Sequence, residues 1–194
     1  MSKPDTRKDH ELMTALQNGD KSAFDVLVER HRKFVLNVIY RYLPDRDEAE
    51  DLAQEVFVRL YQKCNAFQPV AKFTTWLYAL ISNLCLNHVR DAKRRGAVPM
   101  SALGGESRPY DVADTTRLLA SHRIESAEMQ EIVRRMLEEL PGPQRLAVVL
   151  YRFEELSYSD IAEAMQSTVP AVKSLLFRAR ATLAEKLAPY VQTR

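Results

Sequence analysis

Apolar residues recur at helical spacing along most of the chain, and no stretch shows the alternation of a half-buried strand. In the N-terminal half this pattern predicts four helices, over about residues 10–18, 22–43, 47–62 and 74–90. Asn18-Gly19 and Pro44 mark the ends of the first two, because Gly favours a helix C-terminus and Pro cannot continue a helix. Matching apolar stripes on four successive helices indicate one compact bundle.

The C-terminal half repeats this organisation on a smaller scale. Helices are predicted over about residues 129–140, 145–154, 158–165 and 169–187. Ser157 and Asp160 have the spacing of a capping box, Thr168 can cap the last helix, and Pro170 is tolerated in its first turn. The short third helix, the tight turn and the long fourth helix have the arrangement of a helix-turn-helix.

Between these two sets of helices the periodicity fails, from about residue 96 to residue 121. The stretch contains Gly96, Pro99, Gly104 and Gly105, and it is too long for an idle connection within one domain. The sequence therefore predicts an all-α fold of two small helical domains, a four-helix N-terminal bundle (1–95) and a C-terminal helix-turn-helix domain (124–194). A flexible linker (96–123) joins them.

Composition limits the class of protein further. The 194 residues are 46% hydrophobic and 28% charged, as in an ordinary globular protein. No apolar run approaches the roughly 20 residues of a membrane span, and the N-terminus lacks a signal-peptide core. These features predict a cytoplasmic protein without membrane insertion.

Charge is unevenly spread although the formal net charge is only +2. Residues 45–55 hold six acids against one base, residues 90–95 four bases against one acid, and residues 169–194 five bases against one acid. Separate acidic and basic surfaces suggest two different kinds of partner.

A metal centre is not expected. Cys85 and His88 have the i, i+3 spacing of half a zinc site, but no second pair has such spacing. Cys64 is isolated as well, so both cysteines are predicted to be reduced thiols, at least one of them in a core. The sequence predicts neither a metal nor a cofactor.

The last helix is a candidate reader of duplex DNA. Val172, Leu176 and Leu183 are predicted to face inward. The opposite face of the helix is then basic, and such a face can enter the groove of a DNA duplex. The outward residues are Lys173, Ser174, Phe177 and Arg178, with Arg180 at the flank. A solvated basic helix with its Phe tucked against a neighbour is the simpler alternative.

The helix predicted at 74–90 carries polar groups on an otherwise apolar sequence. Asn83, Asn87 and Arg90 fall on one stripe, which Lys93 and Arg94 extend if the helix continues, and Trp76 lies two turns earlier. Amides beside aromatic rings (Phe73, Trp76, Tyr78) are suited to unpaired bases, which are held by stacking and by hydrogen bonds to their edges. The alternative is structural, with Trp76 in the core and the amides bonded inside the bundle.

A third stripe, formed by Glu48, Asp51 and Glu55 with Gln54 beside it, lies on the outer face of the helix at 47–62. As an enzyme site it would bind Mg²⁺ for nuclease chemistry, but three carboxylates along one convex face do not converge on an ion. A solvated face or a docking surface for a basic partner is the preferred interpretation.

Three segments together resemble an extracytoplasmic function (ECF) sigma factor of bacterial RNA polymerase. They are DEAEDLAQEVFVRLYQK, FTTWLYALISNLCLNHVRDAKRR and LPGPQRLAVVLYRFEELSYSDIAEAMQSTVPAVKSLLFRARATL, in the family's order and over nearly the whole chain. The resemblance implies a transcription initiation factor, not an enzyme, that directs core RNA polymerase to promoters of a specialised, stress-response regulon and helps to melt them. The linker would thread through polymerase.

The resemblance also implies roles for particular residues. Residues of the first segment would contact core polymerase: Asp51, Gln54, Glu55 and Phe57. The second segment would read and melt the −10 element through Trp76, Asn83, Asn87, Arg90, Lys93 and Arg94. The third would read the −35 element through Lys173, Ser174, Phe177 and Arg178, with Arg180 on the backbone. Family members are also controlled by an anti-sigma protein, which is a further implied partner.

Two positions depart from the family pattern. The turn Gln166-Ser167-Thr168 lacks the usual Gly, so it needs either a residue near the left-handed region or a slightly different path. Glu154-Glu155 also stands where a Gly is often found. The main alternative function is a stand-alone helix-turn-helix regulator that binds palindromic duplex as a dimer. That alternative gives the stripe of residues 83, 87 and 90 no role.

Overall fold

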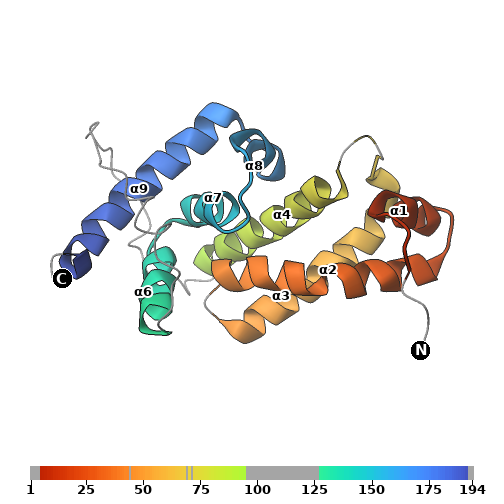
Figure 1. Cartoon of the computed structure of the whole chain (residues 1–194), viewed down its shortest axis with the longest axis horizontal. Helices are drawn as coiled ribbons and strands as arrows, with labels where there is room; N and C mark the ends of the chain where they lie inside the picture. Colours follow the sequence, from red (N-terminus) through yellow and green to blue (C-terminus); the bar gives the residue numbers. More distant parts are fainter. Residues whose placement is uncertain (1–4, 44, 69, 71, 95–126, 192–194) are drawn as a thin grey trace. The chain divides into compact units, whose positions relative to one another are not determined.

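The computed structural model describes residues 5–43, 45–68, 70, 72–94 and 127–191, and within this part every regular element is helical. The N-terminal helices are α1 (Asp9–Gln17), α2 (Lys21–Tyr42), α3 (Arg46–Gln62), the short 3-10 helix η1 (Cys64–Ala66) and α4 (Phe73–Arg94). The C-terminal helices are α6 (Ala127–Glu138), α7 (Gly142–Arg152), α8 (Tyr158–Ala164) and α9 (Val169–Val191) (Figure 1).

The all-α prediction is confirmed, and the chain divides into two compact units. The first contains the helices from α1 into α4 as far as Cys85, and the second contains the greater part of the C-terminal helices. The predicted linker (96–123) and the domain boundaries beside it lie outside the described residues. No helix in the described ranges is both long and apolar enough to cross a membrane.

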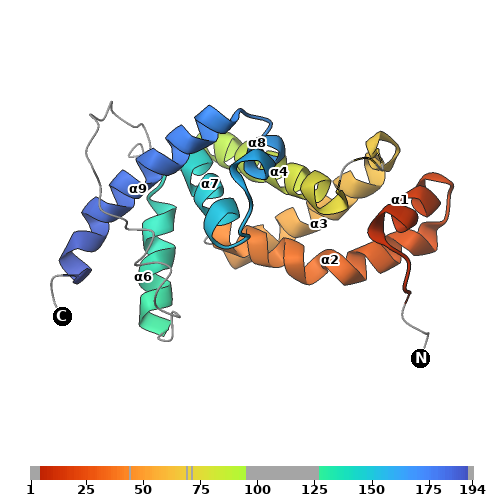
Figure 2. The same cartoon turned by 45° about the horizontal axis from the view of Figure 1, so that its top comes forward.

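The N-terminal helices pack around α2, which contacts both α1 and α3 (Figures 1 and 2). Their core consists of the fully buried side chains of Leu12, Met13, Leu27, Val35, Val38, Ile39, Val56, Leu60, Leu77 and Ile81. The predicted stop of α1 is confirmed: Gly19 has φ 93° and the Asp20 N–H donates to the Ala15 carbonyl at 3.0 Å. The periodic apolar positions of α2 and α3, among them Leu27, Val35, Val56 and Leu60, are thus buried as the sequence pattern predicted.

In the C-terminal helices, α7 packs against α9 around Leu146, Val149, Leu150, Val172 and Leu176. The prediction that α7 begins at Arg145 was wrong, because it begins at Gly142. Pro143 stands in the first turn, where its missing N–H costs no helical hydrogen bond. The Pro-Gly-Pro sequence therefore starts one helix as well as ending another.

Candidate nucleic-acid interface

The amide stripe of α4 lies on a side of the helix that is open to solvent. Asn83 is half-buried, while Asn87, Arg90 and Arg94 are exposed. No hydrogen bond inside the described part of the chain engages the amide of Asn83 or of Asn87. On the opposite side Leu77, Ile81 and Cys85 are fully buried. The helix therefore has a core side and an open side, and the amides lie on the open one.

The aromatic residues near this stripe are less available than the sequence suggested. Phe73 and Tyr78 are buried, and the Tyr78 ring packs edge-on against Phe34 with centroids 5.0 Å apart. Trp76 is half-buried, with its ring 5.4 Å from that of Phe67. The expectation that Phe73 and Tyr78 offer stacking faces was wrong, because both rings belong to the core. Trp76 alone keeps an accessible part.

The basic end of α4 reaches further than the 74–90 segment in which the stripe was found, because the helix continues to Arg94. Arg94 lies 4.0 Å from Asp91, but both side chains are mostly exposed, so water screens this pair. The Lys93 side chain lies outside the described residues. Arg90 and Arg94 thus form an exposed basic end of α4.

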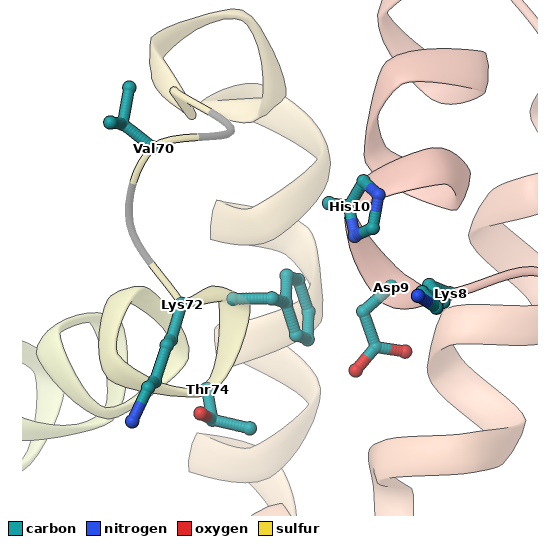
Figure 3. A pocket seen from close by; sticks show the side chains of 7 residues that line it. Lys8, Asp9, His10, Val70, Lys72 and Thr74 are labelled. Carbon is teal, nitrogen blue, oxygen red and sulfur yellow. The ribbon is translucent and has the colours of Figure 1, made fainter.

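A hollow of about 400 Å³ lies between the start of α1 and the start of α4. Figure 3 shows Lys8, Asp9 and His10 on one side and Val70, Lys72 and Thr74 on the other. The Asp9 carboxylate is paired with Arg30 at 2.6 Å, and His31 Nε2 lies 3.1 Å from its other oxygen. None of the predicted −10 residues lines this hollow, and no sequence signal links its two sides, which are some 60 residues apart.

The α8–turn–α9 unit forms through the predicted caps. The Asp160 N–H donates to Ser157 Oγ at 3.2 Å, and the Ala171 N–H donates to Thr168 Oγ1 at 3.3 Å. Gln166 takes the left-handed conformation with φ 49°, and the Ser167 N–H closes the end of α8 onto the Ala162 carbonyl at 2.8 Å. Of the two ways open to a turn without Gly, the chain uses a non-glycine residue in the left-handed region.

The outer face of α9 carries the predicted side chains. Lys173, Ser174 and Arg178 are exposed, and Phe177 is 45% exposed. The inward residues Val172, Leu176, Ala179 and Leu183 are buried, which fixes the direction of this face. Arg178 Nη2 donates to Ser174 Oγ at 3.1 Å, so these two polar groups form one unit. An exposed Phe beside cations is unusual on a solvated surface and suits a sugar or a thymine methyl.

The acidic stripe of α3 also faces outward. Asp51 and Gln54 are exposed, and Glu55 pairs with Arg59 at 2.7 Å one turn later. Phe57 is only 8% exposed and lies beneath this surface, in the core. Val58 follows on the exposed face, 46% exposed, and the sequence analysis did not single it out. The stripe is thus a charged face with an apolar residue at its end.

Metal-binding geometry is not found in the described ranges. No group of three or more His, Cys, Asp or Glu side chains within them could hold an ion. Cys85 is buried, and desolvation raises the pKa of its thiol well above the usual value. This cysteine is therefore a protonated core residue.

Comparison with known proteins identifies the family. The models of sigma-70 region 2 and sigma-70 region 4 match residues 27–95 and 130–183. The RNA polymerase sigma-H factor of Pseudomonas aeruginosa is 35% identical over 191 residues, covering 95% of this chain and 96% of that protein. The ECF RNA polymerase sigma-E factor of Escherichia coli is 32% identical over 187 residues, with the same coverage of both chains. The chain belongs to the sigma-70 family and, within it, to the ECF sigma factors.

Solved structures show the same fold. The structure of CnrH in complex with the cytosolic domain of CnrY matches with a TM-score of 0.63 at 24% identity, over 92% of this chain and 96% of that one. The sigma factor RpoE in complex with the anti-sigma factor NepR from Bartonella quintana matches with a TM-score of 0.59 at 21% identity, over 84% of this chain and 96% of that one. The protein is a sigma-type transcription initiation factor that recognises promoters.

Proposed function

We propose that the open side of α4 holds unpaired bases of the −10 element during promoter melting. Asn83 and Asn87 hydrogen-bond to exposed base edges, Arg90, Lys93 and Arg94 follow the strand, and Trp76 borders the site. The observation that carries this proposal is that half-buried Asn83 and exposed Asn87 have no hydrogen-bond partner among the described residues, while Leu77, Ile81 and Cys85 on the other side of the helix are fully buried. An unpaired amide is free to bond to a base at no cost in protein hydrogen bonds.

The other two surfaces complete the proposal. On α9, Lys173, Ser174, Phe177, Arg178 and Arg180 contact the −35 element. On α3, Asp51, Gln54 and Glu55 dock on core RNA polymerase, with Phe57 supporting them from below. The chain acts in the cytoplasm, where polymerase works, and is not itself an enzyme. Regulation by an anti-sigma protein is consistent with the solved complex of the sigma factor RpoE with the anti-sigma factor NepR.

Asn83→Ala tests the α4 assignment. A lost base–amide hydrogen bond is worth about 0.5–1.5 kcal/mol, so we expect the open fraction to fall by about two- to tenfold. Permanganate reactivity of melted thymines in the holoenzyme–promoter complex measures this fraction, and co-purification with core polymerase measures assembly. Promoters come from a randomised library selected with the unaltered holoenzyme.

Asn37→Ala is the matched control, since Asn37 is an exposed asparagine on α2, away from the stripe. It should leave both measurements unchanged. If Asn83→Ala lowers assembly as much as melting, or changes neither, Asn83 has no part in capturing bases and the α4 assignment is wrong.

A further inference from the structure

Two tyrosines in the C-terminal helices form a pair that the sequence analysis did not single out. Tyr151 lies near the end of α7 and Tyr158 is the first residue of α8, and both are half-buried. Their ring centroids are 5.3 Å apart with an interplanar angle of 33°, which is close enough for offset stacking. The pair therefore joins the end of one helix to the start of the next.

Each ring lies beneath a cation of α9. Lys173 Nζ is 5.9 Å from the Tyr158 centroid, and the guanidinium carbon of Arg180 is 5.9 Å from the Tyr151 centroid. Both distances are within the range of a cation–π interaction. Because Lys173 and Arg180 are seven residues apart, they lie on one side of α9, separated by roughly 10 Å along its axis. The two neighbouring tyrosine rings thus each lie under one cation of α9, Tyr158 under Lys173 and Tyr151 under Arg180.

The Tyr151 hydroxyl stays neutral beside Tyr158. A hydrogen bond to the Tyr158 hydroxyl raises the pKa of Tyr151 above its ordinary value, which keeps the Tyr151 hydroxyl protonated and neutral. The neighbouring polar residues are held differently, because Arg178 bonds to Ser174 on its own helix. The face of α9 therefore carries two sets of groups. Lys173 and Arg180 each lie over a tyrosine ring. Ser174, Phe177 and Arg178 form the second set and contact neither ring in this way.

We propose that Tyr151 and Tyr158 are positioning residues that hold Lys173 and Arg180 against the phosphate backbone of the −35 element, while Ser174, Phe177 and Arg178 face the bases. This rests on the proposed role of α9, and it moves Lys173 from base reading to backbone contact. A Lys ammonium held over a ring acts as a point charge, which suits a phosphate. Phosphate contacts fix the register of a protein on DNA, and base contacts supply the specificity.

The experiment is a double-mutant cycle in the holoenzyme, with a labelled promoter duplex whose −35 element was selected by the unaltered holoenzyme from a randomised library. Tyr158→Leu removes the ring but keeps an apolar side chain. We expect it to weaken binding by about two- to fivefold, the size of an exposed cation–π contact. Lys173→Met should weaken binding to selected and mismatched −35 elements by the same factor and make the salt dependence shallower.

The proposal is tested by the coupling between Tyr158 and Lys173, that is, by whether the effect of Tyr158→Leu on binding depends on Lys173. In the Lys173→Met background Tyr158→Leu should have no further effect, whereas in an Arg178→Ala background its effect should remain in full. Tyr158→Phe, which keeps the ring, should retain nearly all of the binding. Equal losses from Tyr158→Leu with and without Lys173 would overturn the proposal.

Folding and the role of α9 are checked separately. Thermal melting will show whether Tyr158→Leu is folded. If it is unfolded, Lys173→Met alone still tests the backbone contact. A loss of binding confined to the selected −35 element would mean that Lys173 reads bases, and it would contradict the proposal. If neither Lys173→Met nor Arg178→Ala affects use of the −35 element, the proposed role of α9 itself is wrong. If both matter and only the coupling is absent, the positioning role alone is wrong.

Discussion

Two non-glycine residues of the described chain have positive φ, one after α7 and one after α8, the two helices that precede α9. Glu155 has φ 54° after α7, and Gln166 has φ 49° after α8. A residue with a Cβ in the left-handed region is strained by roughly 1–2 kcal/mol. Both residues lie in the two stretches, 154–155 and 166–168, in which the sequence analysis noted the absence of glycine. Each turn is therefore made at the cost of a strained backbone.

Gln166→Gly should therefore stabilise the protein. Relief of the strain outweighs the extra chain entropy of glycine by roughly 0.5–1 kcal/mol. Urea unfolding followed by circular dichroism measures the change. The same substitution in a helix interior is the control: Gln54→Gly on α3 should destabilise by about 1 kcal/mol, because glycine is a poor helix former. A loss of stability for Gln166→Gly would mean that its side chain contributes more than its backbone costs.

Sequence reasoning was strongest for local features at this scale. The caps at Ser157 and Thr168 and the left-handed residue in the Gly-free turn follow from rules that involve only near neighbours in sequence. Phe73 and Tyr78 were misplaced because their burial depends on rings from other elements, Phe67 and Phe34. The tyrosine pair was missed for the same reason, since the cations that it supports come from a different helix.

Among the elements, α3 is the clearest case of two opposite faces. Its N-terminus is capped by Asp45, which accepts from the Glu48 N–H at 2.9 Å, and its buried side includes Val56 and Leu60. The exposed side carries the acidic residues Asp51 and Glu55, and it ends with two exposed hydrophobic side chains, Val58 and Tyr61. An exposed carboxylate such as Asp51, which takes no part in the cap or the core, favours a basic partner through its charge.

Asp51→Arg tests this face. Reversal of a charge at the centre of the stripe should weaken assembly with core polymerase by roughly tenfold, more strongly at low salt than at high salt. Fluorescence titration of labelled protein with core polymerase measures the affinity. Asp25→Arg, an equal change at an exposed site on α2, is the control and should leave assembly unaffected. Equal effects of the two variants would indicate a general response to net charge.

On the scale of the whole molecule, the proposed DNA contacts are divided between α4 in the N-terminal half and α9 in the C-terminal half. Periodicity predicted both helices, because each has a continuous buried side. It could not establish whether the open sides bind DNA, since a solvated helix has the same pattern. The order of three motifs along the chain carried the functional interpretation, and the family matches over residues 27–95 and 130–183 support it.

This division predicts weak DNA binding by the free chain. The proposed α9 contacts include three cations, Lys173, Arg178 and Arg180, so the logarithm of the binding constant for −35 duplex should fall with the logarithm of salt concentration with a slope of about −3. The holoenzyme should bind a full promoter far more tightly and with a steeper slope, because it also engages the melted strand. Fluorescence anisotropy across a salt series measures both. A stand-alone dimeric regulator would instead bind palindromic duplex tightly without polymerase, and that result would contradict the division of contacts proposed for this chain.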